Sequence, residues 1–251
     1  MSVTVEVRGF AALVTMRWAD KRNALGPSEA REITAAVDRA AEQALAAVVL
    51  TGEGAFCSGG DLRTFADISA RHSVTDIRDH VYADMQGILR ALAACPVPTI
   101  AAVDGPAIGL GFDLALACDM RFVGPSGWLQ QGWAMAGLIN ATGGIALMNA
   151  LNPAAVWRVI AEQPRLDRET ASDLGLAERA DGTAVDSAIA RAQQLSAIPR
   201  DVLTHYCELD RGCRWPDPSH FDRAAAIQAE LIGSPRFREL AEARLNRAAA
   251  R

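Results

Sequence analysis

The chain has 251 residues, of which 50% are hydrophobic and 22% are charged, and its formal net charge is −5 at pH 7. This length fits one large domain, or one domain with a helical appendage, and the composition is that of an ordinary soluble enzyme. The negative charge argues against the electrostatic footprint of a nucleic-acid-binding protein and against a polybasic membrane patch.

The cysteines and the N-terminus indicate a cytoplasmic protein. Five cysteines are present without a CxxC pair, and none of the four histidines pairs with a cysteine at zinc spacing. This pattern indicates reduced thiols and predicts no metal site. The opening residues "MSVTVEVRGF" alternate like a strand and lack the features of a signal peptide. No apolar run approaches the roughly 20 residues of a membrane span, so we expect neither a membrane nor a nucleic-acid partner.

The first half of the chain alternates strand and helix patterns. Predicted strands cover residues 3–8, 12–16, 46–52, 98–105 and 119–124. Predicted helices cover residues 28–46 and 76–94. Buried strands separated by helices indicate right-handed βαβ units.

The second half is mainly helical in pattern. Predicted helices cover residues 143–151, 153–161 and 183–197, and prolines at 199, 216 and 218 punctuate a helical tail that runs to Arg251. We therefore place a boundary near residue 197. It divides a core of residues 1–197 from a C-terminal helical region of residues 198–251.

Two glycine-rich turns each follow a buried strand: "GAFCSGGD" at 54–61 and "GPAIGLGFD" at 105–113. A glycine turn that leads into a helix leaves backbone N–H groups without partners, and these suit an anion or a developing oxyanion. Two such turns could direct one N–H each at a single carbonyl oxygen. The alternative is that the glycines only allow a helix to pack closely on the sheet. Neither turn carries a complete dinucleotide fingerprint.

These turns carry a resemblance to a known family. "AFCSGGDL" and "DGPAIGLGFDLALACDMRF" resemble the two signature loops of the crotonase (enoyl-CoA hydratase/isomerase) superfamily. Further matches are "DKRNALG" (20–26), "AAVVLTGEG" (46–54), "CPVPTIAAVDG" (95–105) and "GSPRF" (233–237). The resemblance implies an α/β fold, a crotonase-like spiral of ββα units with a C-terminal helical region. It also implies a homotrimer or dimer of trimers, and an acyl-CoA thioester as ligand, with coenzyme A as part of the substrate and no separate cofactor.

The resemblance also implies an oxyanion hole. In the family's pattern its two backbone donors are the N–H groups at Gly60 and Leu110. The family often has glycine at the second position, but a backbone donor survives a change of side chain if the backbone angles stay accessible.

The family's acid/base pattern is broken in this chain. Hydratases of the family use two glutamates, and these positions align with Asp113 and Trp133. An indole has no acid/base function near neutral pH, so Asp113 is the remaining candidate. The alternative for Asp113 is a structural one, because the helix dipole favours an Asp in the first turn. Trp133 could likewise simply pack in the core.

Other branches of the family fit less well. The aryl-CoA dehalogenases have a tryptophan at the position of Trp133, but their nucleophilic aspartate aligns with Ala141. His80, Tyr82 and Gln86 lie on the helix that, in some relatives, directs a functional side chain into the pocket. An exposed helical face explains these three residues equally well.

The family pattern also assigns residues that bind the substrate. We expect these to be Ser58, Gly59, Arg63, Gly109, Trp133 and Leu138. The backbone of the first turn would hold the adenine end of coenzyme A and Arg63 its phosphates, while Arg247 would add charge. We expect Asp61 to cap the following helix and Cys57 to be a small packing residue.

The leading hypothesis is an enoyl-CoA hydratase/isomerase-like enzyme, a lyase or isomerase. It would stabilise a thioester enolate in the hole formed by Gly60 and Leu110, with Asp113 as the lone acid/base. Two alternatives stay open: a non-catalytic acyl-CoA-binding protein, and an acyl-CoA hydrolase or decarboxylase of the same fold.

Overall fold

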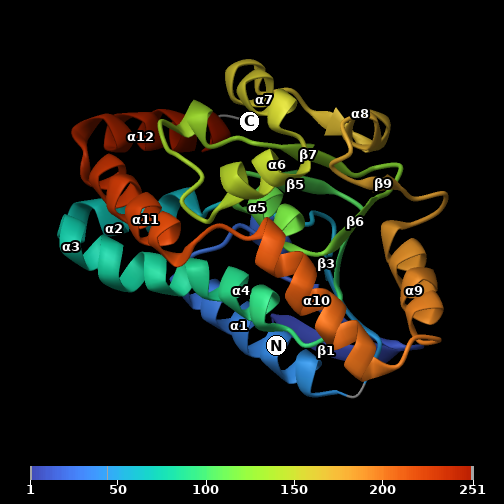
Figure 1. The fold of residues 1–251 in the computed structure, drawn as a ribbon. Coiled ribbons are helices and arrows are strands. Elements are labelled where there is room, and N and C mark those ends of the chain that lie inside the picture. The colour runs from blue at the N-terminus through green and yellow to red at the C-terminus, as the bar shows by residue number, and fades with distance from the viewer. Residues whose placement is uncertain (1, 44, 250–251) are drawn as a thin grey trace.

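The computed structural model describes residues 2–43 and 45–249. The five predicted strands and one strand that was not predicted, β9, form one sheet with the order β1-β2-β3-β4-β6-β9 (Figure 1). Its strands are β1 (Val3–Arg8), β2 (Ala11–Met16), β3 (Ala47–Gly52), β4 (Thr99–Val103), β6 (Met120–Val123) and β9 (Glu178–Arg179). β1 pairs with β2 antiparallel, and the remaining neighbours are parallel. β4 is buried at every residue because helices cover both faces of the sheet.

Alternation along β2 assigns its side chains to two apolar clusters. Ala12, Val14 and Met16 lie in the larger cluster, with α1 (Pro27–Glu42) and α4 (Tyr82–Ala94). Ala11 and Leu13 lie in the smaller one, with α9 (Ala184–Leu195). Figure 1 shows α9 on the opposite side of the sheet from α1 and α4. The period of two in a strand thus places the core on both faces.

The segment between β3 and β4 is more broken than predicted. α2 (Leu62–Arg71) begins after Asp61, whose carboxylate accepts hydrogen bonds from the N–H groups of Arg63 and Thr64, so the predicted cap is present. The helix predicted over 76–94 divides into α3 (Val74–Asp76), a π-helical turn at Ile77–Val81, and α4. α1 ends at Glu42, before the end predicted at residue 46.

Sequence patterns did not reveal a second, smaller sheet, with the order β5-β7-β8. Its strands are β5 (Pro106–Ile108), β7 (Trp128–Gln130) and β8 (Leu166–Asp167), which are too short to show alternation. α5 (Leu110–Ala117) follows β5 directly. The helices predicted after residue 143 are α6 (Gly144–Leu151), α7 (Val156–Glu162) and α9, with α8 (Arg168–Asp173) before β9.

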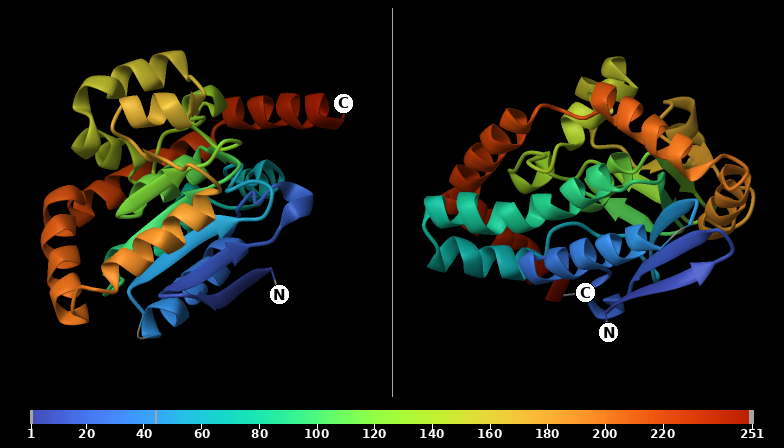
Figure 2. Two further views of the ribbon diagram at one scale, coloured as in Figure 1. Left: turned by 90° about the vertical axis from the view of Figure 1, so that its right-hand side faces the viewer. Right: turned by 60° about the horizontal axis from the view of Figure 1, so that its bottom comes forward.

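Three helices follow the boundary predicted near residue 197: α10 (Arg200–Arg214), α11 (Pro218–Gly233) and α12 (Pro235–Ala249). Phe221, Ile232 and Phe237 on these helices join the larger apolar cluster of the sheet. α12 packs against α2 and projects beyond the other helices in the left view of Figure 2. The C-terminal region therefore shares a core with the sheet.

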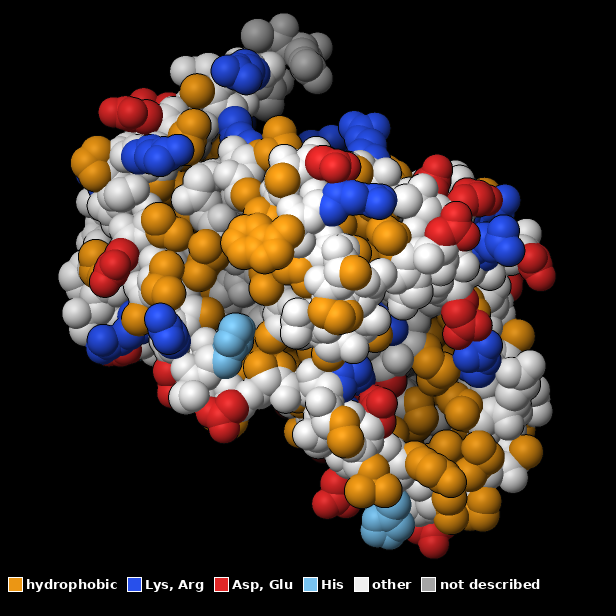
Figure 3. Space-filling view, turned by 45° about the horizontal axis from the view of Figure 1, so that its top comes forward, with side chains coloured by type: hydrophobic (Ala, Val, Ile, Leu, Met, Phe, Trp, Pro, Cys, Tyr) orange, Lys and Arg blue, Asp and Glu red, His pale blue; other side chains and the backbone are white. Residues whose placement is uncertain are grey.

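Charged side chains of both signs are interspersed over the face of the molecule in Figure 3. In the part of the chain that the structure describes, no helix has both the length and the apolar character needed to cross a membrane.

Candidate functional site

The two glycine-rich turns lie side by side. The N–H of Cys57 donates to the carbonyl of Pro106 at 3.0 Å, and the N–H of Ile108 donates to the carbonyl of Cys57 at 2.9 Å. A Cβ atom at Gly105 would lie 2.1 Å from the carbonyl oxygen of Gly54, and one at Gly111 would lie 2.2 Å from that of Cys57. At these two positions glycine is required for close packing. The alternative role of the glycines, which is to permit close packing, therefore applies to part of the motif.

Two backbone amides where the glycine turns meet, those of Gly60 and Leu110, are without hydrogen-bond acceptors among the described residues. The residues on either side of Gly60 are paired with Leu25, through the bonds Leu25 N–H to Gly59 C=O and Asp61 N–H to Leu25 C=O, each of 2.9 Å. Leu110 is the first residue of α5, where an amide has no acceptor within the helix. Among the described residues, neither the Gly60 nor the Leu110 amide has a hydrogen-bond acceptor. Their convergence on one oxygen stays a prediction.

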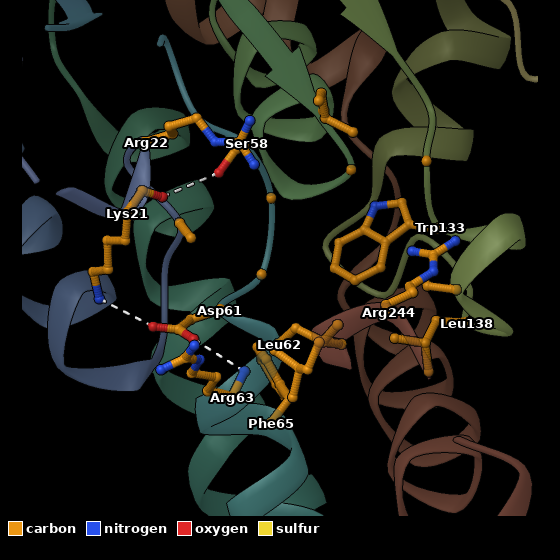
Figure 4. A pocket seen from close by; sticks show the side chains of 18 of the residues that line it. Lys21, Arg22, Ser58, Asp61, Leu62, Arg63, Phe65, Trp133, Leu138 and Arg244 are labelled. Atoms are coloured by element: carbon orange, nitrogen blue, oxygen red, sulfur yellow. Dashed lines mark hydrogen bonds and ion pairs between the residues drawn. The ribbon is translucent and has the colours of Figure 1, made fainter. Parts of the chain in front are cut away.

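A cavity of about 700 Å³ opens at these turns. Figure 4 shows Lys21, Arg22 and Ser58 on one side of the cavity and Trp133, Leu138 and Arg244 on the other. The wall also includes apolar side chains from α2, α4 and α12, namely Leu62, Phe65, Tyr82, Phe237 and Leu245. The cavity thus joins a basic end to an apolar region.

Most of the predicted binding residues line this cavity. They are Ser58, Gly59, Arg63, Gly109, Trp133 and Leu138, together with Gly60. The side chains of Leu110 and Asp113 are fully buried, and neither residue is among the described residues that form the wall.

Of the three candidates near the start of α4, Tyr82 lines the cavity. His80 is exposed, whereas the amide nitrogen of Gln86 donates to the carbonyl oxygens of Ala141 and Phe221. The ring of Tyr82 is buried, and its hydroxyl has no hydrogen-bond partner of normal geometry among the described residues. Burial raises the pKa of this hydroxyl, which Gln228 nearby opposes, so Tyr82 stays protonated.

Basic residues surround one end of the cavity. The Lys21 ammonium is held by the carboxylates of Glu29 at 2.8 Å and Asp61 at 3.2 Å. Within the described residues, Arg22 and Arg63 form no ion pair, so their guanidinium groups are available for the phosphates of a ligand.

Two cations of the cavity wall, Arg22 and Arg244, were not predicted from the sequence. Arg22 lies in the matched "DKRNALG" segment, which was a usable signal, and its backbone has a φ of 52°. Arg244 is on α12, where the resemblance is loose, and its guanidinium donates to the carbonyl of Met135 at 2.6 Å. Arg247, the residue expected to add charge, is exposed and is not one of the described residues that form the wall.

Asp113 is enclosed by three neutral donors. Its carboxylate accepts hydrogen bonds from the Trp133 indole N–H at 3.1 Å, the Thr142 hydroxyl at 2.5 Å and the Asn140 amide at 2.7 Å. Burial raises the pKa of Asp113 to about 7, although these three donors favour the ionised form. A carboxyl group with this pKa can exchange a proton near neutrality, but its neighbours already occupy both oxygens.

A chain of side-chain amides ends at Asp113. Gln163 donates to Gln131 at 2.7 Å, Gln131 donates to Asn140 at 2.6 Å, and Asn140 donates to the carboxylate. The orientation of each amide is set by the next one, and the ionised form of the carboxylate fixes the orientation of all three because it only accepts hydrogen bonds. This chain orders the loop of residues 131–142, which carries Trp133.

Trp133 separates Asp113 from the cavity. The indole lines the cavity, and its N–H points away from it, toward Asp113. A Cβ atom built at Gly109 would lie 3.7 Å from Cε2 of the indole. The ring therefore lies close to Gly109 of the second glycine turn and donates to the buried carboxylate.

The remaining chemistry of this region is limited. Burial raises the pKa of the Cys57 thiol to about 12, so it is a packing residue and not a nucleophile. The described residues contain no group of three or more His, Cys, Asp or Glu side chains that could hold a metal ion.

Comparison of the sequence with known proteins gives one consistent result. The profile of the enoyl-CoA hydratase/isomerase family matches residues 8–238. A probable enoyl-CoA hydratase of Rhodobacter capsulatus is 31% identical over 251 residues, which is 98% of this chain and 95% of that protein. A probable enoyl-CoA hydratase of Mycobacterium tuberculosis is 32% identical over 204 residues, 80% of this chain and 78% of that protein.

Solved structures agree on the fold. An enoyl-CoA hydratase from Bacillus halodurans superposes with a TM-score of 0.87 at 17% identity, covering 97% of this chain and 100% of that one. An enoyl-CoA hydratase/isomerase from Mycobacterium paratuberculosis gives a TM-score of 0.84 at 24% identity, covering 96% and 97%. The predicted crotonase-like α/β fold, with its C-terminal helices, is confirmed.

Proposed function

Because the chain belongs to the enoyl-CoA hydratase/isomerase family, we propose that it is an enzyme that acts on an acyl-CoA thioester bound in the cavity between the two glycine turns. The observation that carries the proposal is the pair of amides at Gly60 and Leu110. The two amides have no acceptors among the described residues and lie on adjacent turns, which line one cavity through Gly60 and Gly109. The wall of the same cavity carries guanidinium groups, those of Arg22 and Arg63, which a polyphosphate ligand requires.

The proposed role of these amides is electrostatic. A thioester carbonyl placed between them accepts two hydrogen bonds, which strengthen as negative charge develops on its oxygen. The donors are fixed in backbone and need no reorganisation during the reaction, and one such donor contributes about 2.7–4 kcal/mol of transition-state stabilisation. The same hole serves an enolate or a tetrahedral oxyanion, so it leaves the reaction open. Membership of the family puts the enoyl-CoA hydratase/isomerase type of reaction first in the proposal.

A second candidate is supported by the position of the carboxylates. Among the described residues that line the cavity, the carboxylates are Asp20 and Asp61, and Asp61 already binds Lys21 and caps α2. Asp113 is behind the indole of Trp133. Hydrolysis or decarboxylation of a thioester, or acyl-CoA binding without turnover, depends less on a positioned pair of carboxylates than hydration does.

The backbone donor at Leu110 can be removed by one substitution. Proline is favoured at the first residue of a helix and lacks the N–H, so Leu110→Pro deletes the donor while keeping the helix start. Leu110→Ala is the matched control, because it loses the same side chain and keeps the amide. We expect Leu110→Pro to lower kcat/KM by about 10²–10³-fold relative to Leu110→Ala.

A turnover screen of the purified protein should test short, long, branched and aromatic enoyl-CoAs for hydration and isomerisation. It should also test saturated acyl-CoAs for hydrolysis and 2-carboxyacyl-CoAs for decarboxylation. Rapid hydration of crotonyl-CoA would select the leading candidate. Tight acyl-CoA binding without turnover of any of these would select the binder. Equal activity in the proline and alanine variants would overturn the proposed hole.

The family resemblance also leads us to propose assembly as a homotrimer or dimer of trimers. Light scattering on the purified protein tests this, since a particle mass other than three or six chains contradicts it.

A further inference from the structure

Trp133 and Asp113 form a locked pair at the wall of the cavity. The indole N–H donates to the carboxylate at 3.1 Å, and both side chains are buried, Trp133 at 5% exposure and Asp113 at 0%. Trp133 lines the cavity, but Asp113 is not among the described residues that do so. A ligand in the cavity therefore meets the ring, and reaches the carboxylate only if the ring moves.

The ring is held on several sides. Thr142 donates to the same carboxylate oxygen as the indole, and Asn140 donates to the other oxygen. Together they fix the carboxylate that orients the indole. Gly132 has a φ of 67°, and a Cβ atom there would lie 3.2 Å from the amide nitrogen of Gly109. The loop of residues 131–142 therefore packs closely against the second glycine turn. The indole thus occupies space next to the predicted thioester site in one fixed orientation.

We propose that Asp113 is a positioning residue that acts through Trp133, and that the indole restricts the cavity to compact acyl groups. This inference rests on the proposed acyl-CoA function. It assigns Asp113 a role different from the direct acid/base role expected from the family pattern. It also names the substrate class, which is acyl-CoA thioesters whose acyl group is short enough to end before the indole.

The first test needs no ligand. In 15N-labelled protein, the indole N–H signal of Trp133 is assigned from its loss in Trp133→Phe. We expect this signal to shift with pH as Asp113 titrates, with a midpoint near 7, and to become insensitive to pH in Asp113→Asn. The exposed Trp157 supplies the control signal, since its side chain is far from burial at 77% exposure. A Trp133 signal that does not respond to pH or to Asp113→Asn would overturn the pairing.

The second test measures acyl-chain selectivity by calorimetric binding of butyryl-CoA and octanoyl-CoA. We expect wild type to bind octanoyl-CoA no more tightly than butyryl-CoA. Trp133→Ala should bind octanoyl-CoA at least tenfold more tightly than it binds butyryl-CoA, because each methylene that becomes buried adds about fourfold in affinity. Trp157→Ala should leave the ratio of the two affinities unchanged. An unchanged ratio in Trp133→Ala would overturn the restriction.

Two milder variants keep the test decisive if Trp133→Ala does not fold. Trp133→Phe retains a ring and removes the N–H, whereas Asp113→Asn removes the carboxylate. Both should shift the ratio of octanoyl-CoA to butyryl-CoA affinity in the same direction as Trp133→Ala. The variant with both substitutions should shift this ratio no further than the single substitution with the larger effect, since both act through one hydrogen bond. A ratio unchanged in both, or additive shifts, would overturn the proposal. Failure of wild type to bind either thioester would refute the acyl-CoA function and the restriction, while the indole signal would still report on the pairing.

Discussion

Asp113 and Asp119 lie near the two ends of α5 and are both largely enclosed, yet their surroundings push their pKa values in opposite directions. Asp113 is surrounded by neutral donors, and burial raises its pKa to about 7. Burial also acts on Asp119, but the charge and hydrogen bond of Arg211, the amide of Thr99 and the charge of Arg214 hold its pKa below the usual value. The presence of a cation decides the difference.

The two aspartates differ in role. Asp119 is a structural carboxylate, whereas Asp113 can change its protonation state near neutrality. Asp119 joins α10 to β4, since Arg211 and Arg214 contact it at 2.5 and 2.7 Å and the Thr99 N–H donates to it at 2.7 Å. Asp113 joins the second glycine turn to the loop of Trp133, next to the candidate site. A buried carboxylate without a cation is the one that responds to pH and to ligands near neutrality.

The largest effect should come from Asp119→Ala. Removing it leaves the buried guanidinium group of Arg211 without a carboxylate, whereas Arg214 keeps its ion pair with Asp210, and breaking a buried ion pair costs about 3–5 kcal/mol. Urea denaturation should show this loss in the free energy of unfolding. The exposed Asp201 on α10 is the control, and Asp201→Ala should cost less than about 1 kcal/mol. A loss below 1 kcal/mol in Asp119→Ala would mean that Asp119 does not anchor α10.

The next effect is on the pH dependence of stability. The folded pKa of Asp113 is about 7, and an unfolded Asp titrates near ~3.9. Between these values the folded state keeps a proton that the unfolded state releases, so this contribution to stability falls as pH rises from about 4 to about 7. At about 1.4 kcal/mol per pKa unit the change is a few kcal/mol. Asp113→Asn should flatten this part of the profile.

Asp119 should behave in the opposite way. Because its folded pKa is lowered, its contribution to stability is present above the unfolded pKa and is lost as pH falls below it. Asp119→Asn should therefore change the acid limb of the profile and retain the slope between about pH 4 and pH 7. If Asp113→Asn retains that slope as well, Asp113 is not the group that titrates there.

A smaller effect should come from the hydrogen bond between Thr142 and Asp113. Thr142→Val keeps the shape of the side chain and removes the 2.5 Å hydrogen bond to Asp113, which should cost about 1–2 kcal/mol. Losing a donor also favours the neutral carboxyl group, so the indole titration of Trp133 should move to higher pH. Thr34→Val, which removes a hydroxyl bonded within α1, should leave that titration unchanged. A midpoint that stays in place in Thr142→Val would show that the hydroxyl does not hold the carboxylate.

The resemblance singled out Asp113 by its position, but the sequence could not show how the surroundings of the two aspartates in "FDLALACD" differ. The difference depends on Arg211 and Arg214 in one case and on Trp133, Asn140 and Thr142 in the other. These partners are brought together by tertiary structure, which a local pattern does not encode.

The main sheet and the adjacent glycine turns were predictable for the opposite reason. Their signals, the apolar strands and the glycines that permit close backbone contact, are local. The strands β5, β7 and β8, and β9 at the edge of the main sheet, lacked such a signal because they are only two or three residues long. Arg244 lay in a region of loose resemblance, so its place at the cavity was visible only in the structure.

The most direct test of the account is isotope-edited infrared spectroscopy of bound butyryl-CoA with 13C at the thioester carbonyl. We assign polarisation of this carbonyl to the backbone amides, and we expect no contact between it and Asp113. We predict a carbonyl band shifted to lower frequency in wild type, Leu110→Ala and Asp113→Asn, with a clearly smaller shift in Leu110→Pro. A full shift in Leu110→Pro, together with its loss in Asp113→Asn, would contradict the account and place the carboxylate at the thioester.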